Sequence, residues 1–194
     1  MTGSRTMRVV TGSLCLLAAA LAHQWLEATM LRHMLLQLPC SAAAGWLLSG
    51  NPRWRQRAAA FDRHGLSVFT AALFVSAYWM IPRALERSTT DALAETLKFG
   101  TLFALGAALP GAMARANGII QIFFIGNFCA MTAVVGMLYQ DQSTQLCNAY
   151  LVDDQAATGI GLVLASGALA IWCCLRLAMS RSAHGCDARS PPAP

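Results

Sequence analysis

Six apolar segments, each close to the length that crosses a lipid bilayer, constrain the fold of this chain more than any other feature. A membrane-spanning helix needs about 20 mostly apolar residues, because each residue adds about 1.5 Å to a hydrocarbon core about 30 Å thick. Only 12% of the 194 residues are charged, against about 25% in an ordinary soluble domain. We therefore expect an all-α fold, a polytopic membrane helix bundle that occupies residues 1–180. Its six transmembrane helices are predicted over residues 8–27, 29–49, 65–81, 94–114, 118–139 and 156–177.

The distribution of charge predicts the orientation of this bundle. Loops rich in Arg and Lys remain in the cytoplasm. If both termini are cytoplasmic, most of the 14 basic residues lie on the inner side, among them the arginine-rich stretch between Gly50 and Arg63. Most acidic residues then lie at or near the outer surface. The net charge of +5 predicts contact with membrane lipid, and we expect no nucleic-acid partner.

The two ends of the chain carry further expectations. The first 22 residues have a basic start, an apolar run and an Ala-Leu-Ala end, like a secretory signal. Cleavage there would leave His23 as the new N-terminus on the outer side, so we interpret the segment as a retained first helix. Residues 181–194 are polar and proline-rich, and we expect a disordered tail. The chain has no phosphate-binding glycine loop and no GxSxG or HExxH signature, so we do not expect an enzyme.

Polar and sulfur-bearing side chains interrupt the apolar segments near one end. Ionisable residues inside membrane spans are costly, usually face the bundle interior, and mark functional sites by default. Here they come from five of the six segments and share the outer side of the membrane. They are His23, Glu27, Met30, His33, Met34, Gln37, Tyr78, Trp79, Met80, Glu95, Lys98, Asp153, Asp154 and Gln155.

Within residues 29–49 the spacing favours a common site. Residues three or four apart share one face of a helix, so Met30 neighbours both His33 and Met34. Imidazole with thioether suits copper, and thioether favours Cu(I) in particular. The alternative is that the methionines only fill the core and that His33 forms a hydrogen bond. Glu95, Gln37 and Tyr78 are the candidate partners for that bond.

Three blocks of the sequence resemble one family. "MLRHMLL" looks like the "HMxxHxLL" helix of CtaG-type cytochrome c oxidase assembly proteins. "YWMIPRALERSTTDALAETLKF" resembles that family's "WHxPxLYDAA...LEHxxF" segment, and "LVDDQAATGIGLVLASGALAIW" is similar to its "LEDQQxAGxxMWxPG" helix. The residues in step with the family are Trp79, Pro82, Leu85, Ala92, Glu95, Phe99, Asp154, Gln155 and Gly159. The blocks occur in the family's order over most of residues 28–172.

The chain departs from the family at three histidine positions, where it has Thr29, Met80 and Thr96, while His33 is kept. The resemblance implies a metal site, and these replacements would make it softer and better suited to cuprous ion. The alternative is that the chain has lost metal binding and kept only the scaffold. The candidate ligands are His33, Met30, Met34, Met80 and His23. Glu95, Asp154 and Gln155 are candidate supporting groups. Asp154 has a structural alternative, since an acid at the start of a helix is favoured by the helix dipole.

The resemblance implies a membrane assembly factor for a haem-copper cytochrome c oxidase in the bacterial cytoplasmic (inner) membrane. It would assist copper insertion on the periplasmic side, with an oxidase subunit or a copper donor as partner and no small-molecule substrate. One alternative is a structural or haem b-carrying subunit of a respiratory complex. Its axial ligands would be His23 and His33, or a Met with a His. A small transporter is a further alternative, but the expected pair of broken helices in corresponding halves is missing.

Overall fold

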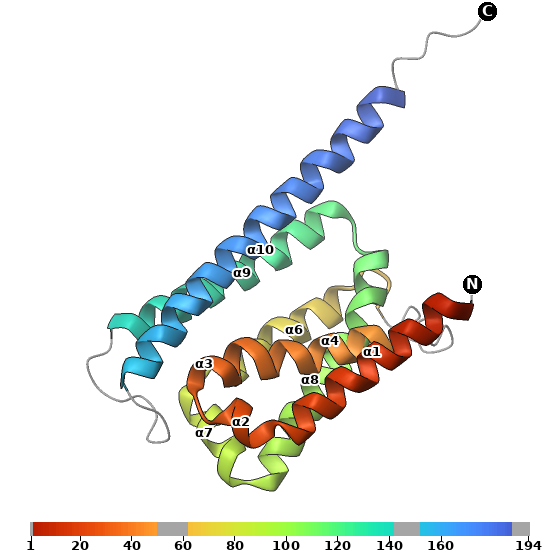
Figure 1. Cartoon of the computed structure of the whole chain (residues 1–194). Helices are drawn as coiled ribbons and strands as arrows, with labels where there is room; N and C mark the ends of the chain where they lie inside the picture. Colours follow the sequence, from red (N-terminus) through yellow and green to blue (C-terminus); the bar gives the residue numbers. More distant parts are fainter. Residues whose placement is uncertain (1, 50–61, 142–151, 188–194) are drawn as a thin grey trace, which may run out of the picture.

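The fold comes from a computed structural model, which describes residues 2–49, 62–141 and 152–187 (Figure 1). Throughout these ranges the regular structure is helical, and the all-α prediction is confirmed there. The elements are α1 (Thr2–Leu21), α2 (His23–Glu27), α3 (Met30–Arg32), a π-helical turn η1 (His33–Gln37), α4 (Leu38–Leu48), α6 (Leu66–Trp79), α7 (Pro82–Thr90), α8 (Ala92–Arg115), α9 (Gly118–Asp141) and α10 (Val152–Asp187).

Several helices have the length and apolar composition of membrane spans. Three qualify within the described residues, namely Ala92–Arg115, Gly118–Asp141 and Asp153–Arg176. Helices α6 and α7 would together make a fourth, although they are bent by 75° at the break between them. These helices indicate a multi-pass membrane protein. The six-span arrangement remains a prediction, because only these three or four segments of the described residues meet the test and the apolar helix Thr6–Leu21 is shorter than a span.

The segment predicted as one helix over residues 65–81 ends earlier and is followed by a second helix. Helix α6 stops at Trp79, and Ile81 adopts an extended conformation with φ −75° and ψ 124°. The residue before a proline is disfavoured in the α region, while proline itself fits the first turn of a helix. Pro82 therefore breaks the predicted span and begins α7. The new helix is amphipathic, with Ala84, Leu85 and Ser88 buried.

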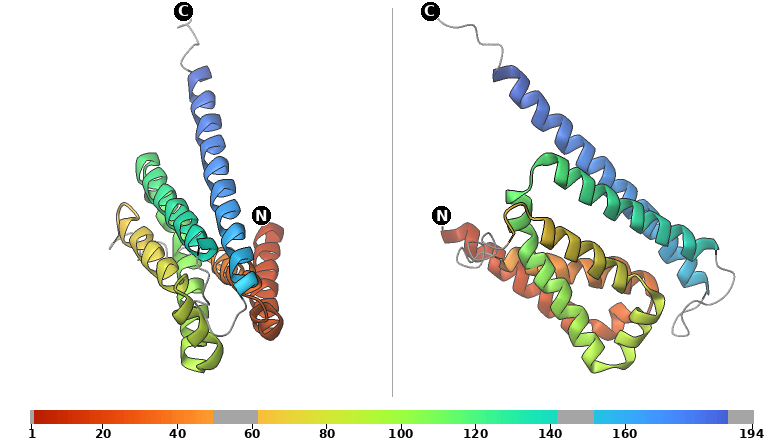
Figure 2. Two further views of the ribbon diagram at one scale, coloured as in Figure 1. Left: turned by 90° about the vertical axis from the view of Figure 1, so that its left-hand side faces the viewer. Right: turned by 180° about the vertical axis from the view of Figure 1, so that it is seen from behind.

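The long helices pack through glycines. A Cβ atom on Gly45 of α4 would overlap the backbone of Phe103 in α8, and one on Gly106 of α8 would overlap the carbonyl of Ala42. Helices α9 and α10, which run side by side in Figures 1 and 2, approach through Gly136 and Gly159 in the same way. Small residues let backbones come close, which is the common way of packing helices where lipid supplies no hydrophobic driving force.

The C-terminal helix is longer than predicted. Helix α10 continues to Asp187, so residues 181–187, which we expected to belong to a disordered tail, are helical. No proline occurs between Asp154 and Pro191, so nothing removes a backbone hydrogen bond at the predicted boundary. Residues 188–194 of the predicted tail lie outside the described residues.

Candidate functional site

Four polar side chains meet in the interior near the ends of α2, η1 and α8. We call Glu27, His33, Gln37 and Lys98 the polar cluster. The Nζ atom of Lys98 lies 2.8 Å from Oε1 of Glu27, 3.0 Å from Nε2 of His33 and 3.3 Å from Oε1 of Gln37. Nε2 of Gln37 also donates to Oε1 of Glu27, at 3.1 Å. One ammonium group is therefore surrounded by a carboxylate, an imidazole and an amide oxygen.

The polar cluster is almost closed to solvent. Lys98 and Gln37 are each 1% exposed and His33 is fully buried, whereas the Glu27 side chain is 12% exposed. A buried charge is strongly destabilising unless it is paired and its remaining hydrogen-bonding capacity is met. Lys98 meets this condition because Glu27 supplies the opposite charge. Glu27 is thus the member of the cluster that stands nearest to the surface.

The π-helical turn η1 positions two members of the cluster. The backbone N–H of Leu38 donates to the carbonyl of His33, five residues earlier, in place of the usual four. This widened turn leaves both His33 and Gln37 buried. Single π-helical turns inside α-helices are rare and occur frequently at functional sites. On the same helix the Ser41 hydroxyl donates to the Gln37 carbonyl at 2.8 Å, which satisfies a backbone group next to the wide turn.

Glu27 reaches the cluster because the chain turns sharply before η1. Helix α2 ends at Glu27, and Thr29 is extended, with φ −134° and ψ 144°. The Thr29 hydroxyl oxygen then accepts hydrogen bonds from the backbone N–H and the Nε of Arg32, and so caps α3. This break lets a residue from the end of the first helical segment face a residue inside the second.

Three methionines gather beside the polar cluster. Met30 and Met34 are buried together with Leu85, Tyr139 and Leu162, and Met80 packs against this group. We call Met30, Met34 and Met80 the sulfur cluster. Met34 and Met80 also line a cavity of about 350 Å³ between η1, α4, α6, α8, α9 and α10. Thioethers from two separate parts of the sequence therefore line one cavity.

Hydrogen bonds from the last two helices hold the backbone of the sulfur cluster. Oδ2 of Asp154 in α10 accepts from the backbone N–H of Met30. The Tyr139 hydroxyl in α9 donates to the Met80 carbonyl, and Nε2 of Gln155 donates to the Tyr139 carbonyl at 3.3 Å. Asp154 thus supports the first turn of α3, a neighbouring helix. Through these bonds Asp154 supports the Met30 backbone directly, and Gln155 supports the Met80 backbone by way of Tyr139.

The structure brings together some of the predicted site residues. Met30, Met34 and Met80 form one cluster, and His33 lies on the same helical segment with Nε2 directed to Lys98. His23 is half-buried in α2, where its Nδ1 atom lies 3.0 Å from the Ala20 carbonyl oxygen. The described part of the chain contains no group of three or more His, Cys, Asp or Glu residues that could hold a metal ion. Methionine thioethers do not belong to those residue types, and they are the remaining candidate ligands of the prediction.

Sequence reasoning did not anticipate that Lys98 and Glu27 would be the partners of His33. It proposed Glu95, Gln37 or Tyr78, and of these Gln37 joins the cluster through Lys98. Glu95 is half-buried and lies three residues before Lys98 in α8. One signal was present, because Lys98 is the only lysine of the chain and falls inside a predicted span. A lysine at that depth requires an acidic partner, and Glu27 at the end of the first predicted span is one of the few acids predicted at the same depth.

Comparisons of this chain with protein-family models, with curated proteins and with solved structures give no match.

Proposed function

We propose that this protein is a membrane assembly factor for a haem-copper cytochrome c oxidase, and that it holds Cu(I) at the sulfur cluster. It would cross the bacterial cytoplasmic membrane six times, with both termini in the cytoplasm and the sulfur cluster toward the periplasm. The role in assembly of the oxidase is proposed from the resemblance to CtaG-type proteins. The packing of the described residues supplies the support for copper.

The observation that carries the proposal is the packing of Met30, Met34 and Met80 in one group, in which Met34 and Met80 also line a cavity of about 350 Å³. Thioether sulfur is a soft ligand that selects Cu(I) over the harder divalent ions. Methionine side chains have three rotatable bonds and adapt to an irregular space. We therefore expect the two thioethers that line the cavity, with Met30 packed in the same group, to approach an ion by rotation of their side chains.

His33 has a secondary role in this proposal. Its Nε2 atom faces the Lys98 ammonium at 3.0 Å, so a copper ion on that atom would stand next to a second cation. We therefore assign the first copper ligands to the methionine sulfurs. His33 would become a ligand only when Lys98 moves away from its Nε2 atom. The same contact counts against the haem b alternative, because an axial imidazole would have to bring its iron to that atom.

Copper would be received from a copper donor and passed to an oxidase subunit by ligand exchange, with no covalent bond made or broken in the protein. Helices α3 and η1 lie near the end of the bundle that we place toward the periplasm. A protein that works in this way is a metal chaperone and not an enzyme. Its partners are these proteins and the surrounding lipid, with no small-molecule substrate.

Copper affinity tests the proposal directly. We expect anaerobic Cu(I) titration of the purified protein against a competing chelator to show binding. The triple variant Met30→Leu, Met34→Leu, Met80→Leu should weaken it by more than about tenfold, since loss of even a group that supports a metal ligand costs about 10–100-fold. Leucine keeps the apolar volume, so the fold should survive. Met137→Leu is the matched control, because Met137 is 54% exposed on α9.

Equal copper affinity in the triple variant and the wild type would contradict the sulfur site. His33→Gln separates the roles of nitrogen and sulfur, because our assignment expects a smaller loss from it than from the triple variant. A Soret band in the visible spectrum of the purified protein would instead favour the haem-carrying alternative.

The proposed topology has its own test. In a background without native cysteines, Arg63→Cys and Thr89→Cys place one thiol at each end of the α6–α7 segment, and both positions are exposed. We expect a membrane-impermeant maleimide added from the periplasm to label Thr89→Cys and to leave Arg63→Cys unlabelled until the membrane is opened. Labelling in the reverse pattern would mean that the bundle has the opposite orientation, with the sulfur cluster toward the cytoplasm, and would contradict a periplasmic copper site.

A further inference from the structure

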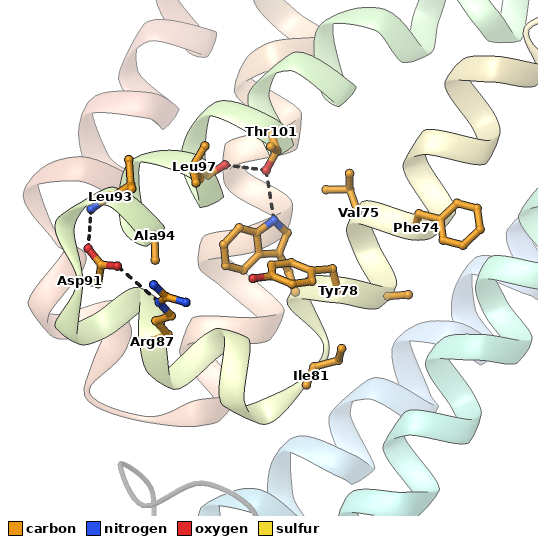
Figure 3. A pocket seen from close by; sticks show the side chains of 12 residues that line it. Phe74, Val75, Tyr78, Ile81, Arg87, Asp91, Leu93, Ala94, Leu97 and Thr101 are labelled. Carbon is orange, nitrogen blue, oxygen red and sulfur yellow. Dashed lines mark hydrogen bonds and ion pairs between the residues drawn. The ribbon is translucent and has the colours of Figure 1, made fainter.

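A long apolar groove lies on the outside of the molecule, between α6, α7 and α8 (Figure 3). Its volume is about 840 Å³. Tyr78 lies in its middle, and the Tyr78 ring is edge-to-face with the ring of Trp79, which also lines the groove, at a centroid distance of 4.9 Å. The exposed apolar side chains that line it are Phe74, Tyr78, Ile81, Leu93 and Leu97.

The floor of the groove is fixed by the contact between α6 and α8. Nε1 of Trp79 donates to the Thr101 hydroxyl oxygen at 3.1 Å, and Trp79 is only 4% exposed. It packs in a buried group with Ala84 and Leu102. The indole N–H is thus satisfied within the protein, and the groove presents carbon to an occupant along most of its length.

Two charged side chains stand together at one end of the groove. Figure 3 shows Arg87 and Asp91 at the end remote from Phe74. Nε of Arg87 lies 3.4 Å from Oδ2 of Asp91, and their side chains are 71% and 37% exposed. Oδ1 of Asp91 also accepts from the backbone N–H of Leu93, which caps α8. The mouth of the groove therefore offers one positive and one negative group, both within reach of solvent.

We propose that this groove binds one phospholipid whose headgroup carries both a phosphate and an ammonium group, as phosphatidylethanolamine does. An acyl chain lies along Leu93, Leu97 and Tyr78, the phosphate bonds to the Arg87 guanidinium, and the ammonium group lies beside the Asp91 carboxylate. Guanidinium matches phosphate in a bidentate geometry. This inference is independent of the proposed copper function, since none of these residues belongs to the sulfur cluster or the polar cluster.

The headgroup decides which occupant the groove prefers. Lipid tails are as apolar as the groove walls, so transfer of an acyl chain from bilayer to groove does not by itself favour binding. A purely anionic headgroup would meet the Asp91 carboxylate, whereas a neutral prenyl quinone would leave both charges unused. A headgroup with one charge of each sign complements Arg87 and Asp91 together.

Native mass spectrometry of the full-length protein, exposed in detergent to equal amounts of phosphatidylethanolamine, phosphatidylglycerol and a prenyl quinone, tests the proposal. We expect the wild type to retain one phosphatidylethanolamine in preference. Arg87→Gln should lower the bound fraction of both lipids about two- to fivefold, the range that an exposed charge interaction supplies. Arg83→Gln is the matched control, because Arg83 is exposed on the same helix and does not line the groove. It should leave retention unchanged.

Two further variants separate the headgroup from the apolar walls. Asp91→Asn keeps a good N-cap for α8, so the helix should remain while the preference shifts toward phosphatidylglycerol. Ala94→Trp should fill the groove and abolish retention, whereas Leu164→Trp, at a 68% exposed position on α10, should not. The proposal is overturned by preferential retention of phosphatidylglycerol or of a prenyl quinone by the wild type, or by equal retention in Arg87→Gln and Arg83→Gln.

Discussion

Lys98→Met is expected to lower the free energy of unfolding by about 3–5 kcal/mol, the cost typical of removing one partner from a buried ion pair. The ammonium of Lys98 is 2.8 Å from Glu27, and the lysine is 1% exposed. Methionine is unbranched and only one atom shorter than lysine, but it leaves the Glu27 carboxylate without a compensating charge. His33 and Gln37 each lose a contact as well. Reversible unfolding in mixed detergent and SDS measures the change.

The double variant Lys98→Met, Glu27→Gln serves as the control. It removes both charges, so it should be more stable than Lys98→Met alone, as found when buried ion pairs are replaced as a unit. A double-mutant cycle with Glu27→Gln isolates the coupling between the two residues. A surface substitution usually changes the free energy of unfolding by no more than about 0.5 kcal/mol. If Lys98→Met changes it by no more than that, Lys98 does not occupy the polar cluster in the folded protein.

Gly106→Ala is the second substitution with a large expected effect. The added Cβ atom would overlap the Ala42 carbonyl, and Gly45 brings the facing backbone of α4 equally close to α8. Neither contact involves a flexible side chain that could rotate away, so the two helices must separate. We expect a loss of stability of about 1–3 kcal/mol, the usual range for overpacking.

Gly100→Ala provides the matched control on the same helix. No atom lies within 4 Å of the Cβ that it would add, so only the backbone effect remains. Alanine is favoured over glycine inside a helix by about 1 kcal/mol, so this variant should be neutral or slightly more stable than the wild type. Thermal unfolding of both variants in one detergent makes the comparison. Equal melting temperatures would mean that α4 and α8 do not pack through Gly106.

The sequence predicted the helical class and the approximate positions of the longest helices. Residues 94–114 and 118–139 were predicted as helices, and α8 and α9 extend only slightly beyond them. Hydrophobicity and length are local properties, and a bilayer allows few alternatives to a helix for an apolar segment of that length. The breaks at Ala22 and Thr29 were harder to predict, because neither carries a proline or repeated glycine. The π-helical turn does have a signal in the sequence, since Pro39 just after it has no N–H to donate to the Leu35 carbonyl and its ring crowds that group.

The candidate site divides in the same way. That Met30, His33 and Met34 lie on one helical segment follows from their spacing, and the unusual presence of histidine and lysine among apolar residues follows from the sequence alone. Only the tertiary structure decided that Lys98 faces His33 and Glu27 across 65 and 71 residues of chain, and that Asp154 supports Met30 across 124. Such pairings depend on how far each helix is rotated and where its neighbour crosses it. Glycine contacts between backbones set those quantities, and they leave no periodic pattern in the sequence of a single helix.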